Sequence, residues 1–169
     1  MECGRVALAG LLGRCPAMES LKREIVRFGP SGLRVHVFGE TGTGKEMVAK
    51  ALHEASPRAR RPLVPLNVAG FSDELFGSEL FGHARGAFTG AVSAREGHVA
   101  AAEGGTLFID EVGDMSALAQ VRLLRFLEAG EYQRLGETAA RRADVRVISA
   151  TNVDLPQRVR EGRFRRDLW

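Results

Sequence analysis

Short apolar runs alternate along the chain with longer amphipathic stretches. Each run is nearly continuous in apolar character and is bounded by Gly, Pro or charged residues, which is typical of strands buried on both faces. The runs are Leu33–Phe38, Leu63–Val68, Thr106–Ile109 and Val145–Ala150. Helical spacing of apolar residues marks Ala17–Phe28, Lys45–Ala55 and Ala117–Glu128. This alternation predicts an α/β domain with a mostly parallel sheet.

Two stretches depart from this alternation. Phe81–Glu96 is rich in Gly, Ala and small polar residues and is too irregular for a helix. Ala129–Ala143 predicts a turn or short hairpin before the fourth strand. On the helix before it, the spacing places Leu118, Val121, Leu124 and Leu127 on one apolar face. Irregular segments on a rigid scaffold are where function concentrates, so both are candidate functional loops.

Composition narrows the class of protein. With 169 residues, 44% hydrophobic and 27% charged, the chain can bury a core, and wholesale disorder is excluded. No apolar run approaches the ~18 residues of a membrane helix. The two cysteines, Cys3 and Cys15, fit neither a zinc spacing nor a disulfide framework. A reducing cytoplasm is therefore the expected location.

The charge is unevenly distributed. The net charge is +3, but residues 1–133 carry 15 basic and 16 acidic side chains, whereas residues 134–169 carry 9 basic and 5 acidic ones. The positive excess therefore lies at the C-terminal end. Such a cluster can meet nucleic acid, phosphates or an acidic protein surface, and charge alone does not choose among them.

A glycine-rich loop follows the first predicted strand and opens a predicted helix. It comprises Gly39, Glu40, Thr41, Gly42, Thr43, Gly44, Lys45 and Glu46. This context is that of a phosphate-binding loop, in which glycines let backbone N–H groups and the helix dipole face the phosphates. Lys45 is expected to reach the β- and γ-phosphates of ATP. Glu46 stands where the general pattern has the Ser or Thr that binds Mg²⁺.

Polar residues end two later strands. Asp110 and Glu111 follow a hydrophobic strand, which places both carboxylates at the carboxyl edge of the sheet beside the phosphate loop. We expect Asp110 to hold Mg²⁺, directly or through water, and Glu111 to polarise the attacking water as general base. Asn152 follows the strand Val145–Ala150 and is a candidate to orient that water or to sense the γ-phosphate.

These motifs resemble a known family. Residues 78–91 read SELFGHARGAFTGA and are similar to the signature loop of bacterial enhancer-binding proteins, the AAA+ activators of sigma-54 RNA polymerase. The hexapeptide GAFTGA is unchanged at Gly86, Ala87, Phe88, Thr89, Gly90 and Ala91. The resemblance extends from Gly13 to Leu168, and this family also carries Glu after the loop lysine.

The resemblance implies further roles. Gly86–Ala91 would form a surface-loop tip that contacts the sigma factor, with Phe88 and Thr89 as the contact residues. Asn67 matches the position that holds the catalytic Glu inactive until the partner engages. Ala129–Ala143 corresponds to a pre-sensor loop that supports the first loop. Arg165 matches an arginine finger given to the ATP of the adjacent subunit.

The resemblance also implies an architecture: a P-loop NTPase (AAA+) three-layer α/β sandwich that spans residues 1–169 and is cut before the last strand and the helical lid. Receiver and helix-turn-helix domains are not expected in this chain. The implied partners are sigma-54 RNA polymerase, a homo-oligomeric ring (hexamer or heptamer), and promoter or enhancer DNA contacted through another region. Without the last strand, Leu33–Phe38 is expected to form an open edge.

Two alternatives remain open at this stage. The first is an AAA+ remodeller whose GAFTGA loop serves another client. The second is a non-hydrolysing regulatory or DNA-binding module, suggested by the basic bias, which predicts salt-sensitive DNA binding without ATP turnover. The presence of Lys45, Asp110 and Glu111 argues against the second alternative.

Overall fold

The computed structural model describes residue 8 and residues 10–169, so Cys3 lies outside the described residues. The sheet strands are β1 (Val35–Phe38), β2 (Leu63–Asn67), β5 (Thr106–Asp110) and β8 (Arg146–Thr151). The helices are α2 (Pro16–Phe28), α3 (Lys45–Glu54), α4 (Asp73–Phe81), α5 (His98–Ala101), α6 (Ala117–Ala129) and α7 (Leu155–Arg160), with a 3₁₀ turn η1 (Val112–Asp114). Two hairpins are formed by β3 (Gly82–His83) with β4 (Arg95–Glu96) and by β6 (Glu131–Tyr132) with β7 (Arg141–Arg142).

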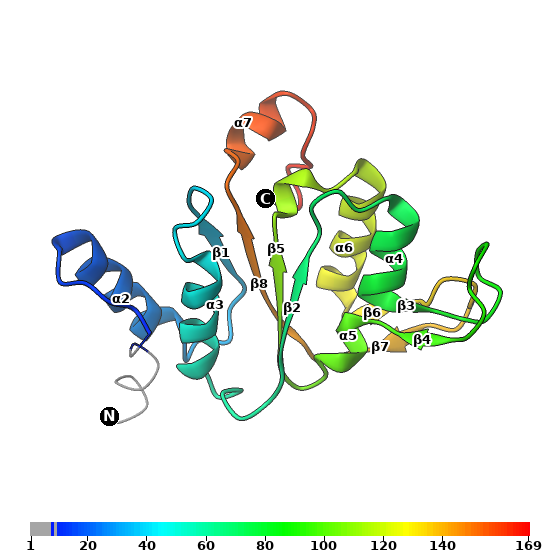
Figure 1. Ribbon diagram of the computed structural model, residues 1–169, viewed down its shortest axis with the longest axis horizontal. Coiled ribbons are helices and arrows are strands. Elements are labelled where there is room, and N and C mark those ends of the chain that lie inside the picture. The colour runs from blue at the N-terminus through cyan, green and yellow to red at the C-terminus, as the bar shows by residue number, and fades with distance from the viewer. Residues whose placement is uncertain (1–7, 9) are drawn as a thin grey trace.

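The central sheet has the order β1-β8-β5-β2, and every pairing within it is parallel (Figure 1). All four predicted strands and the three predicted helices are present, with ends that differ by one or two residues. The strand that precedes the phosphate loop lies beside β8 and forms an edge of the sheet among the described residues. No helix in the described part of the chain is both long enough and apolar enough to cross a membrane.

Both faces of the sheet are buried, and the pleat of the strands directs alternate side chains to the two faces. Alternate residues of a strand point to opposite faces, so Leu107 and Ile109 of β5 pack in the cluster under α4 and α6, whereas Phe108 packs under α2 and α3. In β8, Val147 joins the first cluster and Ile148 the second. The continuous apolar runs therefore build the middle layer of a three-layer sandwich.

The apolar face predicted for α6 from the sequence is partly wrong. The fully buried residues are Ala119, Gln120, Leu123 and Phe126, whereas Leu118 is 45% exposed. Apolar residues occupy more than one side of this helix, so their spacing alone does not select the buried side. The polar side chain of Gln120 is among the most buried of the helix, and its partners are in the site described below.

The spacing of apolar residues does not predict helix α4, because its own apolar and small residues lie on several sides of the helix. It begins at a Ser72 cap, whose hydroxyl accepts a hydrogen bond from the Leu75 N–H at 3.2 Å. Its last two turns are buried, and Gly77 lies so close to α6 that an added Cβ would be 2.6 Å from the Arg122 guanidinium. Tertiary packing, rather than amphipathic spacing, therefore defines this helix.

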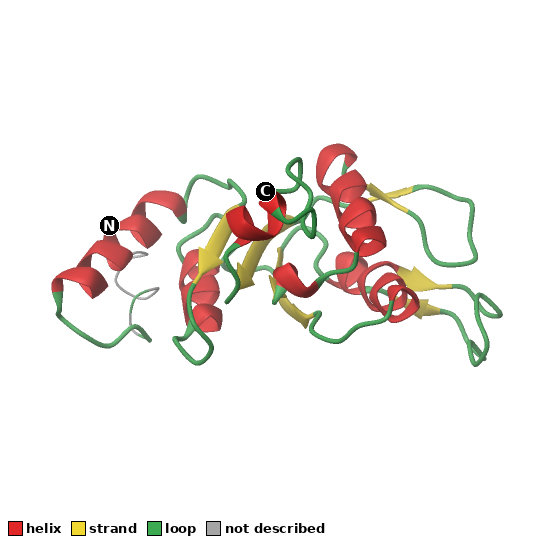
Figure 2. Cartoon of the chain, turned by 90° about the horizontal axis from the view of Figure 1, so that it is seen from above, coloured by secondary structure: helices red, strands yellow, loops and turns green. Residues whose placement is uncertain are grey.

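The two irregular stretches form hairpins that extend beyond the sheet, side by side at its α4–α6 end (Figure 2). The hairpin predicted for Ala129–Ala143 is confirmed as β6–β7. Phe81–Glu96 begins with the last residue of α4 and continues as β3–β4, which brackets the GAFTGA loop. Gly82 has φ +86° and lies against the β4 backbone, where a Cβ would be 2.5 Å from the Arg95 carbonyl oxygen.

Candidate functional site: a nucleotide edge and a two-hairpin surface

The glycine-rich loop connects β1 to α3 as predicted. Gly42 and Gly44 adopt φ values of +81° and +87°, the left-handed region that favours glycine, and Lys45 begins the helix. The Lys45 side chain is only 8% exposed and its ammonium donates to the carbonyls of Gly39 (3.1 Å) and Glu40 (3.3 Å). The loop therefore folds around its own lysine, with α3 pointing its N-terminus into the curl. Glu46 is exposed in the first turn of α3.

Glu111 reaches the loop lysine from the neighbouring part of the sheet. Its Oε1 lies 3.7 Å from Lys45 Nζ, and its Oε2 accepts a hydrogen bond from the Asn152 N–H at 3.3 Å. Its φ of +57° makes it the one non-glycine residue with positive φ in the described part of the chain. Backbone strain of this kind is concentrated at functional sites, where surrounding contacts maintain it. Here Asp110 Oδ1 accepts the Glu111 N–H at 2.9 Å.

Asn152 joins the end of β8 to the loop. Its side-chain amide donates to Thr41 Oγ1 at 2.9 Å, while its backbone bonds Glu111 as described above. The adjacent Gly39 N–H donates to the Thr151 carbonyl at 3.2 Å. Residues predicted from three separate strand ends therefore converge on one polar network at the carboxyl edge of the sheet.

Asn67 ends β2 and stands in register with Asp110. Its Oδ1 accepts a hydrogen bond from the Ala69 N–H at 2.9 Å, which closes a local turn. Among the described residues Asn67 makes no hydrogen bond to Glu111. In this structure Lys45 and Asn152, rather than Asn67, orient the Glu111 carboxylate.

Arg165 lies outside this network, in the segment after α7. Its guanidinium is paired with Asp167, with N–O distances of 2.9 and 2.5 Å. The hydrogen bond to Asp167 raises the pKa of Arg165, and Arg165 in turn lowers the pKa of the Asp167 carboxyl. No ion pair joins Arg165 to the glycine-rich loop within the described part of the chain. The Arg165 side chain is 43% exposed and is held by Asp167.

Gln120 is a positioning residue that the sequence did not single out. It is 1% exposed on α6, and its amide donates to the carbonyls of Met115 and Arg163, both at 3.0 Å. Its Oε1 accepts the Arg165 N–H at 2.8 Å. Gln120 therefore fixes the backbone that carries Arg165. A polar residue at a buried helix position is the only sequence signal for this role.

The GAFTGA loop closes on itself at the tip of the β3–β4 hairpin. Gly86 donates to the Ala91 carbonyl (2.8 Å), and Ala91 donates to the Phe88 carbonyl (3.0 Å). Thr89 is exposed. Phe88 is half-buried, because its ring packs edge-on against His83 with centroids 5.0 Å apart. The two residues expected to contact a partner therefore differ: one is presented to solvent and the other is folded back.

The β6–β7 hairpin supports this loop through its backbone. Ala84 donates to the Leu135 carbonyl, and Leu135 donates to the Gly82 carbonyl, both at 2.9 Å. Gly136 lies against Ala87 so closely that a Cβ would be 2.8 Å from the Ala87 methyl group. Arg134 adds an ion pair with Glu96 of β4 at 2.8 Å. The segment Ala129–Ala143 is thus in direct contact with the hairpin that carries the GAFTGA loop.

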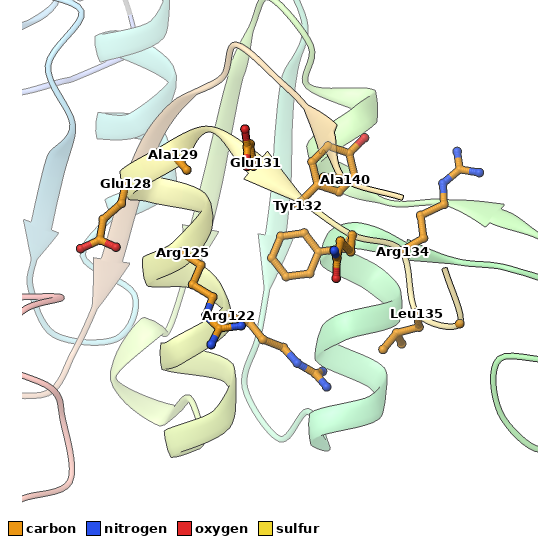
Figure 3. A pocket seen from close by; sticks show the side chains of 12 residues that line it. Arg122, Arg125, Glu128, Ala129, Glu131, Tyr132, Arg134, Leu135 and Ala140 are labelled. Atoms are coloured by element: carbon orange, nitrogen blue, oxygen red, sulfur yellow. The ribbon is translucent and has the colours of Figure 1, made fainter. Parts of the chain in front are cut away.

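A cleft of about 520 Å³ lies behind the β6–β7 hairpin, between this hairpin and α6 (Figure 3). Arg122 and Arg125 of α6 and Arg134 of the hairpin line it, together with Tyr132. None of the predicted nucleotide-site residues lines this cleft. Leu135 lines the cleft, so the cleft adjoins the surface formed by the β3–β4 and β6–β7 hairpins, here called the two-hairpin surface. It lies apart from the network of Lys45, Glu111 and Asn152 at the carboxyl edge of the sheet, here called the nucleotide edge.

A glycine-rich loop between β1 and α3, two consecutive acidic residues at the end of β5 and an amide after β8 are the arrangement of a P-loop NTPase fold, and the chain shares this fold with a solved P-loop NTPase domain at a TM-score of 0.57 and 16% identity. The sequence model of the Sigma-54 interaction domain matches residues 11–169, and the chain belongs to this family. The α/β AAA+ fold expected from the sequence is confirmed.

Relatives and solved structures agree with this assignment. The transcriptional regulatory protein ZraR of Klebsiella oxytoca is 53% identical over 160 residues, covering 95% of this chain and 36% of that protein. The anaerobic nitric oxide reductase transcription regulator NorR of Shigella sonnei is 54% identical over 159 residues, covering 94% and 32%. NtrX from Brucella abortus, crystallised with ATP, superposes with a TM-score of 0.85 at 38% identity, covering 95% of this chain and 36% of NtrX. The chain therefore spans about a third of the length of these relatives.

Proposed function

We propose that this chain is the ATP-hydrolysing part of a sigma-54-dependent transcriptional activator. The observation that carries the proposal is the network of Lys45, Glu111 and Asn152, which gathers a cation, a carboxylate and an amide around the phosphate loop. Membership of the Sigma-54 interaction domain family supports the choice of partner, and the ATP complex of NtrX supports the choice of nucleotide.

In the proposed reaction backbone N–H groups of the loop, such as those of Gly42, Gly44 and Lys45, bind the phosphates, and the Lys45 ammonium neutralises charge on the β- and γ-oxygens. Glu111 accepts a proton from the attacking water, and Asn152 orients that water or senses the γ-phosphate. The proposed role of Asn67 is to draw Glu111 away from its active position, which requires the Asn67 side chain to leave its turn with Ala69.

Asp110 is the residue that would hold Mg²⁺. Its Oδ1 accepts the Glu111 N–H, and its second carboxylate oxygen has no hydrogen-bond partner within the described residues. One carboxylate is a fitting donor set, because Mg²⁺ in such sites keeps several waters and takes its other ligands from the substrate phosphates. When bound, the ion supplies charge neutralisation to the phosphates.

Arg165 is proposed to act on the ATP of a neighbouring copy in a homo-oligomeric ring. Its exposed guanidinium, its separation from its own phosphate loop and the buried Gln120 that holds its backbone all suit this role. Transfer of Arg165 to a phosphate requires exchange of its Asp167 partner, and a phosphate offers the same bidentate geometry with more charge.

The loop Gly86–Ala91 is proposed to contact sigma-54, with Thr89 as the residue presented first. In the full-length protein, the Thr89→Ala variant tests this role directly. We expect it to hydrolyse ATP normally but to lose sigma-54 binding in the presence of ADP and aluminium fluoride, a mimic of the transition state. Unchanged binding of this variant to sigma-54 would show that the loop is not the contact.

A turnover assay tests the enzymatic part. Full-length wild-type protein should release phosphate from ATP with Mg²⁺ as an oligomer, whereas the 169-residue chain alone should be weakly active or inactive. In the full-length protein Lys45→Ala should lose nucleotide binding and turnover together. Turnover without any binding to sigma-54 would instead indicate an AAA+ remodeller of another client. Salt-sensitive DNA binding by this segment, with no turnover even in the full-length protein, would indicate a regulatory module.

A further inference from the structure

The ring of Phe88 is not free at the loop tip but rests on a histidine at the base of the hairpin. His83 ends β3, is 8% exposed, and meets Phe88 in an edge-to-face arrangement with an interplanar angle of 67°. Aromatic pairs in this geometry are attractive beyond their buried area. The contact therefore favours the conformation in which Phe88 is folded back.

A second buried residue fixes the orientation of that histidine. Ser78 Oγ lies 2.8 Å from His83 Nδ1, and Ser78 is only 4% exposed. Rotation of the imidazole would leave two buried polar atoms without partners, which is unfavourable. The orientation of the imidazole against the Phe88 ring is consequently determined by its hydrogen bond to Ser78.

Ser78 belongs to α4, the helix that connects the nucleotide edge to the hairpin (Figure 1). The segment that leads into α4 starts at Val68, whose N–H donates to the Asp110 carbonyl at 3.2 Å. The other end of α4 passes directly into β3 at Gly82. A shift at the acidic pair can therefore reach His83 through one short, rigid helix.

We propose that Ser78 and His83 are positioning residues that hold Phe88 away from the partner until α4 moves. This inference rests on the proposed function, since it specifies how the same loop is controlled. In the folded-back state Thr89 is exposed whereas Phe88 is held against His83. Displacement of Ser78 by movement of α4 removes the hydrogen bond that fixes the imidazole, and Phe88 becomes free to join Thr89 at the partner surface.

Fluorine NMR tests the contact itself. With 4-fluorophenylalanine placed at position 88 alone, the imidazole of His83 shifts the fluorine resonance from its free value. We expect Ser78→Ala and His83→Leu each to move the resonance toward the free value and to sharpen it. Ser78→Ala carries little risk to folding, because Ala is a good helix former. An unmoved resonance in both variants would overturn the proposal.

His98→Leu is the matched control. Its Nδ1 lies 2.7 Å from the Glu79 carbonyl oxygen, so it also ties α4 to the segment after β4, but it is not among the aromatic partners of Phe88. The same substitution there should leave the fluorine resonance in place. A resonance that moves equally in His98→Leu would reduce the effect to general loosening of α4 and would contradict a specific role for His83.

Binding to sigma-54 measures the consequence. In the full-length protein without nucleotide, Ser78→Ala should bind sigma-54 about tenfold more tightly than wild type, as expected when one buried hydrogen bond biases two states. A shifted resonance without this gain, while wild type binds in ADP and aluminium fluoride, would refute the control role. If wild type never binds sigma-54, the proposed function fails, and the NMR result alone decides whether His83 positions Phe88.

Discussion

The nucleotide edge and the two-hairpin surface are built in different ways. At the nucleotide edge, Lys45, Glu111 and Asn152 follow neighbouring strands of one sheet and form a closed polar network. At the hairpins, Ala87 and Gly136 come from distant parts of the chain and meet through small residues and a few backbone hydrogen bonds. The proposed chemistry therefore occupies the part held by the core, and the proposed partner contact the part that can shift with little loss of packing.

The largest expected effect is the loss of ATP turnover when Glu111, a residue of the nucleotide edge, is substituted. Glu111→Gln should lower ATP turnover by roughly 10²–10⁴, the usual contribution of a general base, while ATP binding persists because Lys45 and the loop are unchanged. Phosphate release and binding of a fluorescent ATP analogue measure the two properties. Glu103→Gln, which removes the same charge where Glu103 bonds the Asp144 N–H, is the control and should retain turnover. Equal turnover in both variants would show that Glu111 is not the general base.

A smaller effect is expected at the contact between the hairpins. Gly136→Ala introduces a methyl group at 2.8 Å from the Ala87 methyl and should weaken sigma-54 binding about tenfold by separating the hairpins, with ATP binding retained. Gly162→Ala is the matched control, because Gly162 also has a positive φ (+70°, against +78° for Gly136) but nothing lies near its added Cβ. Similar losses in both variants would attribute the effect to backbone strain alone.

The loss of a single side-chain hydrogen bond should affect ATP binding in one region and not in the other. Asn152→Ala removes the bond to Thr41 Oγ1 and should weaken ATP binding by about three- to tenfold. Gln133→Ala removes a comparable amide bond in the β6–β7 hairpin, to the Thr138 carbonyl, and should not alter it. Isothermal titration with ATP measures both variants. Weaker ATP binding in Gln133→Ala would mean that the hairpin contributes to the nucleotide site.

The most local test concerns individual amides of β1. Gly39 donates to the Thr151 carbonyl of β8, and N–H directions alternate along a strand, so the Val37 N–H faces β8 whereas those of His36 and Phe38 face the open edge. In the 169-residue chain, deuterium exchange followed by NMR should be at least about tenfold slower at Val37 than at Phe38. Equal protection would mean that another strand or molecule covers this edge.

The nucleotide edge could be predicted from the sequence because its residues are adjacent to strands. Continuous apolar runs reveal strands buried on both faces, and parallel strand ends meet at one edge, so Asp110 and Asn152 fall beside the phosphate loop. The hydrogen bond of Asn67 to Ala69, by contrast, depends on a local turn that strand order does not reveal.

The hairpin surface could be located from the sequence but not described. The GAFTGA motif marks the loop, yet the position of the Phe88 ring depends on its contact with His83. The orientation of His83 depends in turn on Ser78, in a helix that spacing did not reveal. The buried side of α6 and the role of Gln120 likewise depend on tertiary partners. These contacts depend on tertiary structure, which local patterns do not specify.

The most direct test of coupling between the two regions is sigma-54 binding to the full-length protein as a function of nucleotide state. Wild type should bind sigma-54 at least about tenfold more tightly with ADP and aluminium fluoride than without nucleotide, and Lys45→Ala should remove the difference. Equal affinity of the wild type in both states would contradict the claim that the nucleotide edge controls the hairpins.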